Sequence, residues 1–193
     1  MPKPQERNLE ETKVAFKSWL ENKILDASSF NVEMLGGPEN TGFSNETLSF
    51  NVTYQLDGSE ISSGMVLRFY PEGFFVFPDY DIHKQFLIMQ KLANYDIKVP
   101  KVLWYEESNN VFGTPFYVME MANGDAPSDN PPFHQEGWVA DSSEGVREKI
   151  WWGWVEQMSK VHQVDITNGD FNFLNRPDLS ETYLEQELQY YFN

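Results

Sequence analysis

Apolar and polar positions repeat along the chain with two periods, which predict its helices and strands. Residues 8–25 and 82–93 carry apolar side chains one helical turn apart, so we expect two amphipathic helices there. An Asp57-Gly58 pair between two apolar segments predicts a hairpin. The order of elements indicates an α+β fold with one helix inserted after the third strand. Alternation or short apolar runs predict the strands themselves at 30–37, 47–54, 64–70, 101–107 and 114–121.

The second half of the chain has a different pattern. Residues 122–137 are rich in Pro, Gly and Asp, which predicts a connector. Asp141 and Glu144 resemble a helix N-cap and its N3 carboxylate, so a long helix is expected to continue to about His162. A final helical piece is predicted within 180–192. Packing in a core or groove is expected for the tryptophans of the long helix, which are Trp151, Trp152 and Trp154.

Composition narrows the possible functions. The 193-residue chain has no cysteine, which excludes a disulfide framework, a Cys-ligated metal and a thiol nucleophile. The formal net charge of −16 repels a phosphate backbone, so no nucleic-acid partner is expected. The charge would attract a cationic substrate, although solubility or a saline habitat explains it more simply. Residues 1–13 lack the apolar segment of a signal peptide, and no apolar run could span a bilayer; we therefore expect a cytoplasmic protein with no membrane partner.

Longer runs of sequence carry a resemblance that the pattern of elements alone does not. They are GFSNETLSF (42–50), MVLRFYP (65–71), HKQFLIMQKL (83–92), VPKVLWYEESNNVFGTPFYVMEMANGD (99–125) and PPFHQEGWVADSS (131–143). In this order, they resemble the aminoglycoside phosphotransferase-like family. The branch they resemble most includes the phosphotransferase-like domain fused to acyl-CoA dehydrogenases.

The resemblance implies a protein-kinase-like fold and an enzymatic activity. Residues 1–121 would form the small lobe, a five-stranded antiparallel sheet with one inserted helix. Residues 122–193 would supply the hinge and the start of a helical large lobe. The implied reaction transfers the γ-phosphoryl group of ATP, with Mg2+, to a hydroxyl group of a small molecule.

The resemblance assigns the phosphate-binding loop to Gly42, Phe43, Ser44 and Asn45. Gly42 permits close approach of the backbone to a phosphate, while Ser44 and Asn45 add hydrogen-bond donors. The spacing matches neither common phosphate-loop fingerprint, so a plain hairpin loop remains an alternative.

Arg68 stands within an apolar strand, at the position where kinases place the lysine that holds the α and β phosphates. A charge buried there without a partner would be costly, and the alternative is an edge-strand arginine that reaches solvent. The matching position on the inserted helix is Gln85, where an ion-pairing glutamate is expected. Arginine is not equivalent to lysine, and glutamine has no charge, so the chain departs from the standard ion pair at both positions.

The hinge between the lobes is implied at the end of the fifth strand. Met119 would border the adenine pocket, while the carbonyl of Glu120 and the amide of Ala122 would bind the adenine edge. In the connector, His134 and Glu136 are too few for a metal site, and a packed loop between lobes is expected instead. No metal ligand is therefore predicted within the chain.

The segment NGDFNFLN (168–175) has the Asp-x4-Asn spacing of a kinase catalytic loop. It comes too early for the family pattern, and Asn168 stands where a histidine is expected. We therefore interpret Asp170 and Asn175 as parts of an ordinary turn. The catalytic loop and the magnesium ligands are expected beyond Asn193, in the remainder of the large lobe.

The sequence thus predicts the N-terminal part of an ATP-dependent small-molecule phosphotransferase that is inactive by itself. One alternative is a non-catalytic pseudokinase module that binds nucleotide or a partner. Another is a purely structural or interaction domain with no nucleotide. The phosphoryl acceptor stays open, because the groups that would contact it are expected mostly outside the chain.

Overall fold

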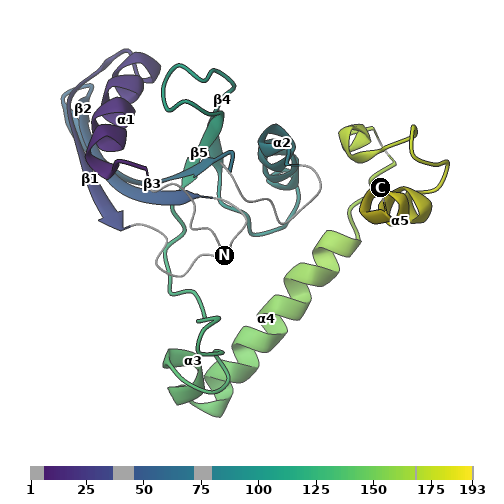
Figure 1. The fold of residues 1–193 in the computed structure, drawn as a ribbon. Helices are drawn as coiled ribbons and strands as arrows, with labels where there is room; N and C mark the ends of the chain where they lie inside the picture. Colours follow the sequence, from purple (N-terminus) through teal and green to yellow (C-terminus); the bar gives the residue numbers. More distant parts are fainter. Residues whose placement is uncertain (1–6, 37–45, 72–79, 168, 193) are drawn as a thin grey trace.

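A five-stranded antiparallel sheet dominates the first half of the chain in the computed structural model, which describes residues 7–36, 46–71, 80–167 and 169–192 (Figure 1). The strand order is β1-β2-β3-β5-β4. Asp57 and Gly58 have φ angles of 50° and 75° and make the tight turn between β2 and β3, as predicted. The strands are β1 (Ala27–Gly36), β2 (Thr47–Leu56), β3 (Ser59–Phe69), β4 (Val102–Glu106) and β5 (Phe116–Glu120).

Helix α1 (Leu9–Lys23) covers one face of the sheet, and its fully buried Phe16 and Leu20 enter the main core. The side chain of Asn8 accepts hydrogen bonds from the amides of Glu10 and Glu11 and thereby caps the helix. Strand alternation sends one set of side chains to this face. The sheet residues of the core are Phe30, Val32, Leu48, Phe50, Val52, Met65, Leu67, Phe69, Phe116 and Val118.

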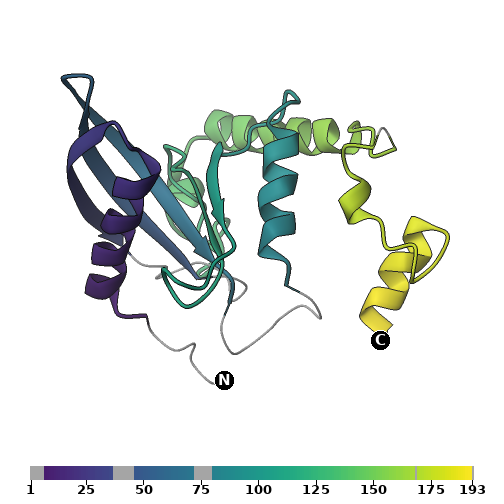
Figure 2. The same cartoon turned by 90° about the horizontal axis from the view of Figure 1, so that it is seen from above.

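Helix α2 (Ile82–Leu92) lies on the opposite face, as Figure 2 shows. Its Ile82 and Phe86 pack with Tyr117 of β5 in a second apolar cluster. Asp81 caps the helix through a 2.7 Å bond from the amide of Lys84 to its side chain. The α+β fold with a helix inserted after the third strand is therefore confirmed.

Helices follow the sheet: α3 (Trp138–Asp141), α4 (Glu144–His162), the short 3-10 helix η1 (Asn172–Leu174) and α5 (Tyr183–Phe192). The predicted cap at Asp141 is wrong, because Asp141 ends α3 and its amide bonds the carbonyl of Gly137. The extended backbone of Ser142 and Ser143 separates the two helices, and Ser143 occupies the N-cap position of α4.

The prediction of core packing for the α4 tryptophans is also wrong for this structure. Trp151, Trp152 and Trp154 are 57%, 59% and 67% exposed. Helix α4 extends away from the sheet with one end near α3 (Figure 1), so the described chain does not cover its apolar side chains. The connector is likewise largely exposed and is not the packed loop that was expected. No helix in the described ranges is long and apolar enough to cross a membrane.

Candidate functional site

Strand pairing places Arg68 on the face of the sheet that carries α2. Its neighbours along β3, Leu67 and Phe69, point into the core under α1, so alternation turns Arg68 the other way. Arg68 pairs across the sheet with Thr47 of β2 and with Tyr117 of β5. Thr47, Arg68 and Tyr117 thus form a cross-strand row, in which the half-buried guanidinium of Arg68 has a neighbouring strand on each side.

The cross-strand neighbour of Arg68 on β5 is a buried tyrosine. Tyr117 is fully buried, and the register of β3 and β5 places it directly opposite Arg68. The Tyr117 hydroxyl donates to the Met89 Sδ of α2 at 3.7 Å. Burial raises the pKa of Tyr117, while the charge of Arg68 acts in the opposite direction. With its pKa raised, the hydroxyl is neutral at physiological pH and can donate to Met89.

Gln85 lies in the second turn of α2 and is half-buried. Its amide bonds the carbonyl of Asp81 at 3.2 Å as part of the helix start. A direct contact between Gln85 and Arg68 stays a prediction. Since the side chain of Gln85 is uncharged, α2 presents no carboxylate at this position.

The predicted hinge begins where β5 leaves the sheet. Met119 pairs with Val66 of β3 and Val102 of β4. Val66 lies two residues before Arg68, so Met119 belongs to the next cross-strand row on the same face of the sheet. The amide of Glu120 then donates to the Lys101 carbonyl at 2.8 Å, and the amide of Met121 donates to the Gly64 carbonyl at 2.9 Å. Glu120 and Ala122 follow as exposed residues. Backbone groups at this edge are therefore held in register with β3 and β4.

Close packing at the hinge depends on a glycine in β3. A Cβ added to Gly64 would lie 2.7 Å from Cε and 2.9 Å from Cβ of Met121. Both separations are shorter than real Cβ contacts, so only glycine lets Met121 approach the strand without a shift.

Gly42, Phe43, Ser44 and Asn45, the predicted phosphate loop, lie outside the described residues. The described chain resumes at Glu46, whose carboxylate pairs with Arg7 at 2.9 Å. Its carbonyl accepts from the amide of Phe69 at 3.1 Å. The start of β2 is thus tied to the end of β3, close to Arg68.

Asp170 and Asn175 take part in contacts that stabilise a turn. Asp170 pairs with Lys91 at the end of α2 at 3.1 Å. Asn175 accepts a 2.9 Å hydrogen bond from the side chain of Gln186 in α5. Gly169 has a φ of 93°, a left-handed turn conformation that favours glycine. These contacts fit the interpretation of NGDFNFLN as an ordinary turn. That Asp170 and Asn175 take no part in catalysis stays a prediction.

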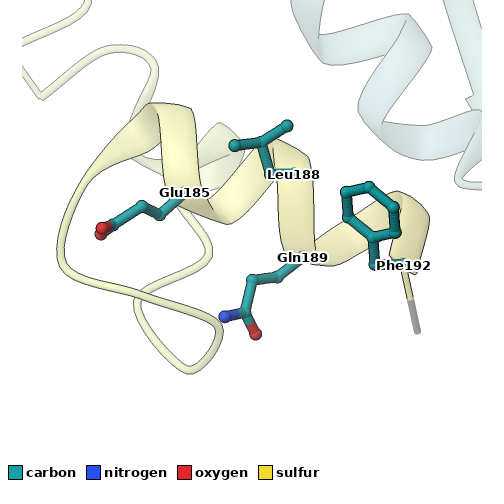
Figure 3. Close-up of a pocket in the computed structure, with 4 residues that line it drawn as sticks. All are labelled: Glu185, Leu188, Gln189 and Phe192. Atoms are coloured by element: carbon teal, nitrogen blue, oxygen red, sulfur yellow. The ribbon is translucent and has the colours of Figure 1, made fainter.

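Neither a metal site nor an enclosed pocket is found among the described residues. In the described part of the chain, no three His, Cys, Asp or Glu side chains form a group that could hold a metal ion. Figure 3 shows a pocket lined by Glu185, Leu188, Gln189 and Phe192. All four belong to α5, and Phe192 is 86% exposed, so this pocket is an open groove along one helix.

Sequence reasoning missed Tyr117, although a signal for it exists. The sequence places it only within a strand, because its relation to Arg68 depends on which strands pair and in what register. Period-two alternation places Tyr117 and Met119 on one face of β5. Adding the β3–β5 register would have identified the tyrosine.

Comparisons with known proteins show which proteins and which family the chain is similar to. The chain is 30% identical over 102 residues to mouse acyl-CoA dehydrogenase family member 10, a match that spans 53% of this chain and 9% of the mouse protein. A solved structure assigned as an aminoglycoside phosphotransferase from Ralstonia eutropha JMP134 aligns with 80% of this chain and 39% of its own, with a TM-score of 0.48 and 21% identity. The chain therefore spans less than half of either protein, 9% of the mouse protein and 39% of the solved chain. The model of the phosphotransferase enzyme family matches residues 46–191. The chain belongs to this phosphotransferase family.

Proposed function

We propose that the chain is the nucleotide-binding part of an ATP-dependent phosphotransferase that acts on a hydroxyl group of a small molecule. The family match over residues 46–191 supports phosphoryl transfer as the reaction class. The observation that carries the proposal is the cross-strand row on the α2 face, where Arg68 lies half-buried beside Tyr117. A guanidinium held in this way suits the bidentate recognition of phosphate oxygens.

The described residues fit ATP better than they fit Mg2+. Met119 and Val66 offer a buried or half-buried apolar surface one row from Arg68, which suits an adenine ring next to its phosphates. Glu120 and Ala122 would supply the backbone groups for the adenine edge, and Gly42 to Asn45 would cover the phosphates. No three acidic or histidine side chains converge on a metal position in the described ranges. The proposal gives the Mg2+ ligands and the proton acceptor to the remainder of the large lobe, as the family resemblance implies.

The proposal also assigns a partner to the second half of the chain. The exposed apolar side chains of α4 and α5 would be covered by the remainder of the large lobe, which would also contain the catalytic Asp and Asn. The large exposure of Trp154 and Phe192, at 67% and 86%, supports this assignment. The isolated chain is then expected to bind ATP without turning it over.

A second candidate is a pseudokinase module that binds nucleotide without transferring phosphate. Arg68 and the uncharged Gln85 favour it, because together they replace the Lys-Glu pair that positions phosphates in active kinases.

Calorimetric titration of residues 1–193 with ATP, with and without Mg2+, tests the proposal. Binding is expected, and Arg68→Met should weaken ATP binding while leaving adenosine binding unchanged. A chain that binds neither ligand would be a structural or interaction domain. Turnover by residues 1–193 that Asp170→Asn abolishes would contradict our interpretation of the turn. Turnover by a longer chain would exclude the pseudokinase alternative.

A further inference from the structure

We propose that residues 169–175, here called the docking turn, hold the C-terminal half of α2 in place. Helix α2 lies on the sheet, whereas the docking turn follows α4 in the second half of the chain. The contact between them therefore joins the two halves. This role does not depend on whether the chain binds ATP.

Helix α2 is packed against the sheet mainly through its first half. Its buried side chains, Ile82 and Phe86, pack with Tyr117 of β5. Half-buried Leu87 and Met89 extend this apolar cluster to the middle of the helix. Among the residues of α2, all of which the structure describes, none after Met89 belongs to the cluster. The last turn of α2 therefore needs contacts from outside the sheet to stay in place.

The first such contact is aromatic. Phe171 of the docking turn is 4% exposed, and its ring centroid lies 6.1 Å from that of Tyr95, a separation typical of favourable aromatic pairs. Tyr95 directly follows α2, and its amide donates to the Leu92 carbonyl at 3.0 Å. Because Phe171 is removed from water at this position, its burial supplies most of the stabilisation of the contact.

The second contact is an ion pair. Asp170 Oδ1 lies 3.1 Å from Lys91 Nζ, and Lys91 belongs to the last turn of α2. Both side chains are partly exposed, so the pair adds little net stability. Its value is geometric: two adjacent residues of the docking turn meet two residues at the end of α2, and two points of contact also fix rotation. Phe171 thus supplies the stabilisation, and Asp170 supplies the register.

The docking turn is closed by its own backbone. The carbonyl of Phe171 accepts from the amide of Leu174 at 2.9 Å, and the carbonyl of Asn172 accepts from the amide of Asn175 at 3.1 Å. The Asn175 side chain then contacts Gln186 of α5, while Asp170 contacts α2. A catalytic Asp and Asn would both have to face one phosphate group and its metal ion. Here the two side chains serve different helices, which fits docking better than catalysis.

Docking has a consequence for the candidate site. Helix α2 lies on the same face of the sheet as Arg68, so the docking turn gives the second half of the chain a hold on the helix beside this site. Loss of docking should loosen the last turn of α2 and leave the sheet intact, because neither Phe171 nor Asp170 belongs to the main core.

Amide hydrogen exchange of residues 1–193, followed by NMR, tests the proposal. Phe171→Ala should speed exchange at the amides of residues 88–92 by roughly tenfold to a hundredfold, the effect of losing one buried aromatic side chain on local opening. The amides of β2 should keep their rates. Phe192→Ala is the matched control, because the same substitution at an 86% exposed side chain should leave α2 unchanged.

A charge reversal tests the ion pair while keeping Phe171, and it carries the test if Phe171→Ala fails to fold. Asp170→Lys places two positive charges together and should speed exchange at the same amides by about twofold to fivefold. Adding Lys91→Asp should restore the original rates, because the pair is re-formed with its charges exchanged.

Three results would overturn the proposal. Unchanged exchange at residues 88–92 in Phe171→Ala would show that the docking turn does not hold α2. Equal acceleration in α2 and β2 would show that Phe171 supports the whole fold instead of one helix. A charge reversal that Lys91→Asp does not rescue would refute the two-point contact.

Discussion

Replacing Gly64 by alanine should disturb the hinge through a single steric contact. The new Cβ would meet Met121 Cε at 2.7 Å and Met121 Cβ at 2.9 Å. The terminal methyl group can rotate away, but Met121 Cβ can move only with its backbone. The Met121 amide is bonded to the Gly64 carbonyl at 2.9 Å, so that movement would also strain a hydrogen bond.

The expected cost follows from two opposing effects. Forcing an extra methyl group into a packed site costs about 1–3 kcal/mol. Replacing glycine within a strand by alanine gains about 0.5–1 kcal/mol, because less backbone entropy is lost on folding. At the midpoints of these two ranges, Gly64→Ala should lower the free energy of unfolding by about 1 kcal/mol, which corresponds to a fall in Tm of about 2–4 °C for a chain of this size.

Thermal unfolding followed by circular dichroism measures this effect, and Gly153→Ala is its control. Gly153 lies within α4, and a Cβ there would meet nothing within 4 Å. Alanine at that position should stabilise the helix by up to about 1 kcal/mol, so the two substitutions should differ in sign. In a Met121→Gly background, Gly64→Ala should lose its cost. A Gly64→Ala protein as stable as the unaltered chain, or a cost that persists without the Met121 side chain, would refute the steric explanation.

Three further predictions concern the core, the pH dependence and the exposed surface. Phe50→Ala should cost about 3–5 kcal/mol in urea unfolding, because Phe50 is fully buried, and a loss below 1 kcal/mol would contradict its place in the core. Hydrogen bonds from Trp19 and Lys23 lower the pKa of Glu106, so its contribution to stability is present above the usual glutamate pKa and is lost as pH falls through the lowered value. Glu106→Gln should therefore reduce the acid dependence of Tm, and an unchanged profile would count against this contribution. Trp154→Gln should change stability by less than about 0.5 kcal/mol while reducing self-association in light scattering; a large loss of stability would show that the side chain is buried in solution.

The sequence predicted the strands best where alternation is strong. The segment 47–54 corresponds to β2 at Thr47–Leu56. By contrast, β3 begins at Ser59, five residues before the predicted start at Gly64. Apart from Ile61, its first residues are polar and lie near an exposed hairpin, so they show no apolar alternation to detect.

The candidate site could be predicted only in part. Arg68 was identified because a charge in an apolar strand is unusual, and this needs only local sequence. Its partner Tyr117 depends on the register between β3 and β5, which no local pattern reveals. The exposure of Trp154 could not be predicted either, since helical periodicity shows which side chains share a face and not what packs against that face.

The position of α4 relative to the sheet depends mainly on what covers its apolar side chains. Polar contacts join it to the segment after α2: Lys160 Nζ lies 2.7 Å from Asp96 Oδ2, and Gln157 accepts from the Lys98 amide at 2.8 Å. Asp96 is almost fully exposed, and an ion pair at such a position contributes little net stability. Burying one large apolar side chain contributes about 1.5–3 kcal/mol. A surface that covered Trp154 and its neighbours would therefore outweigh the polar contacts, which orient the helix but do not determine where it packs.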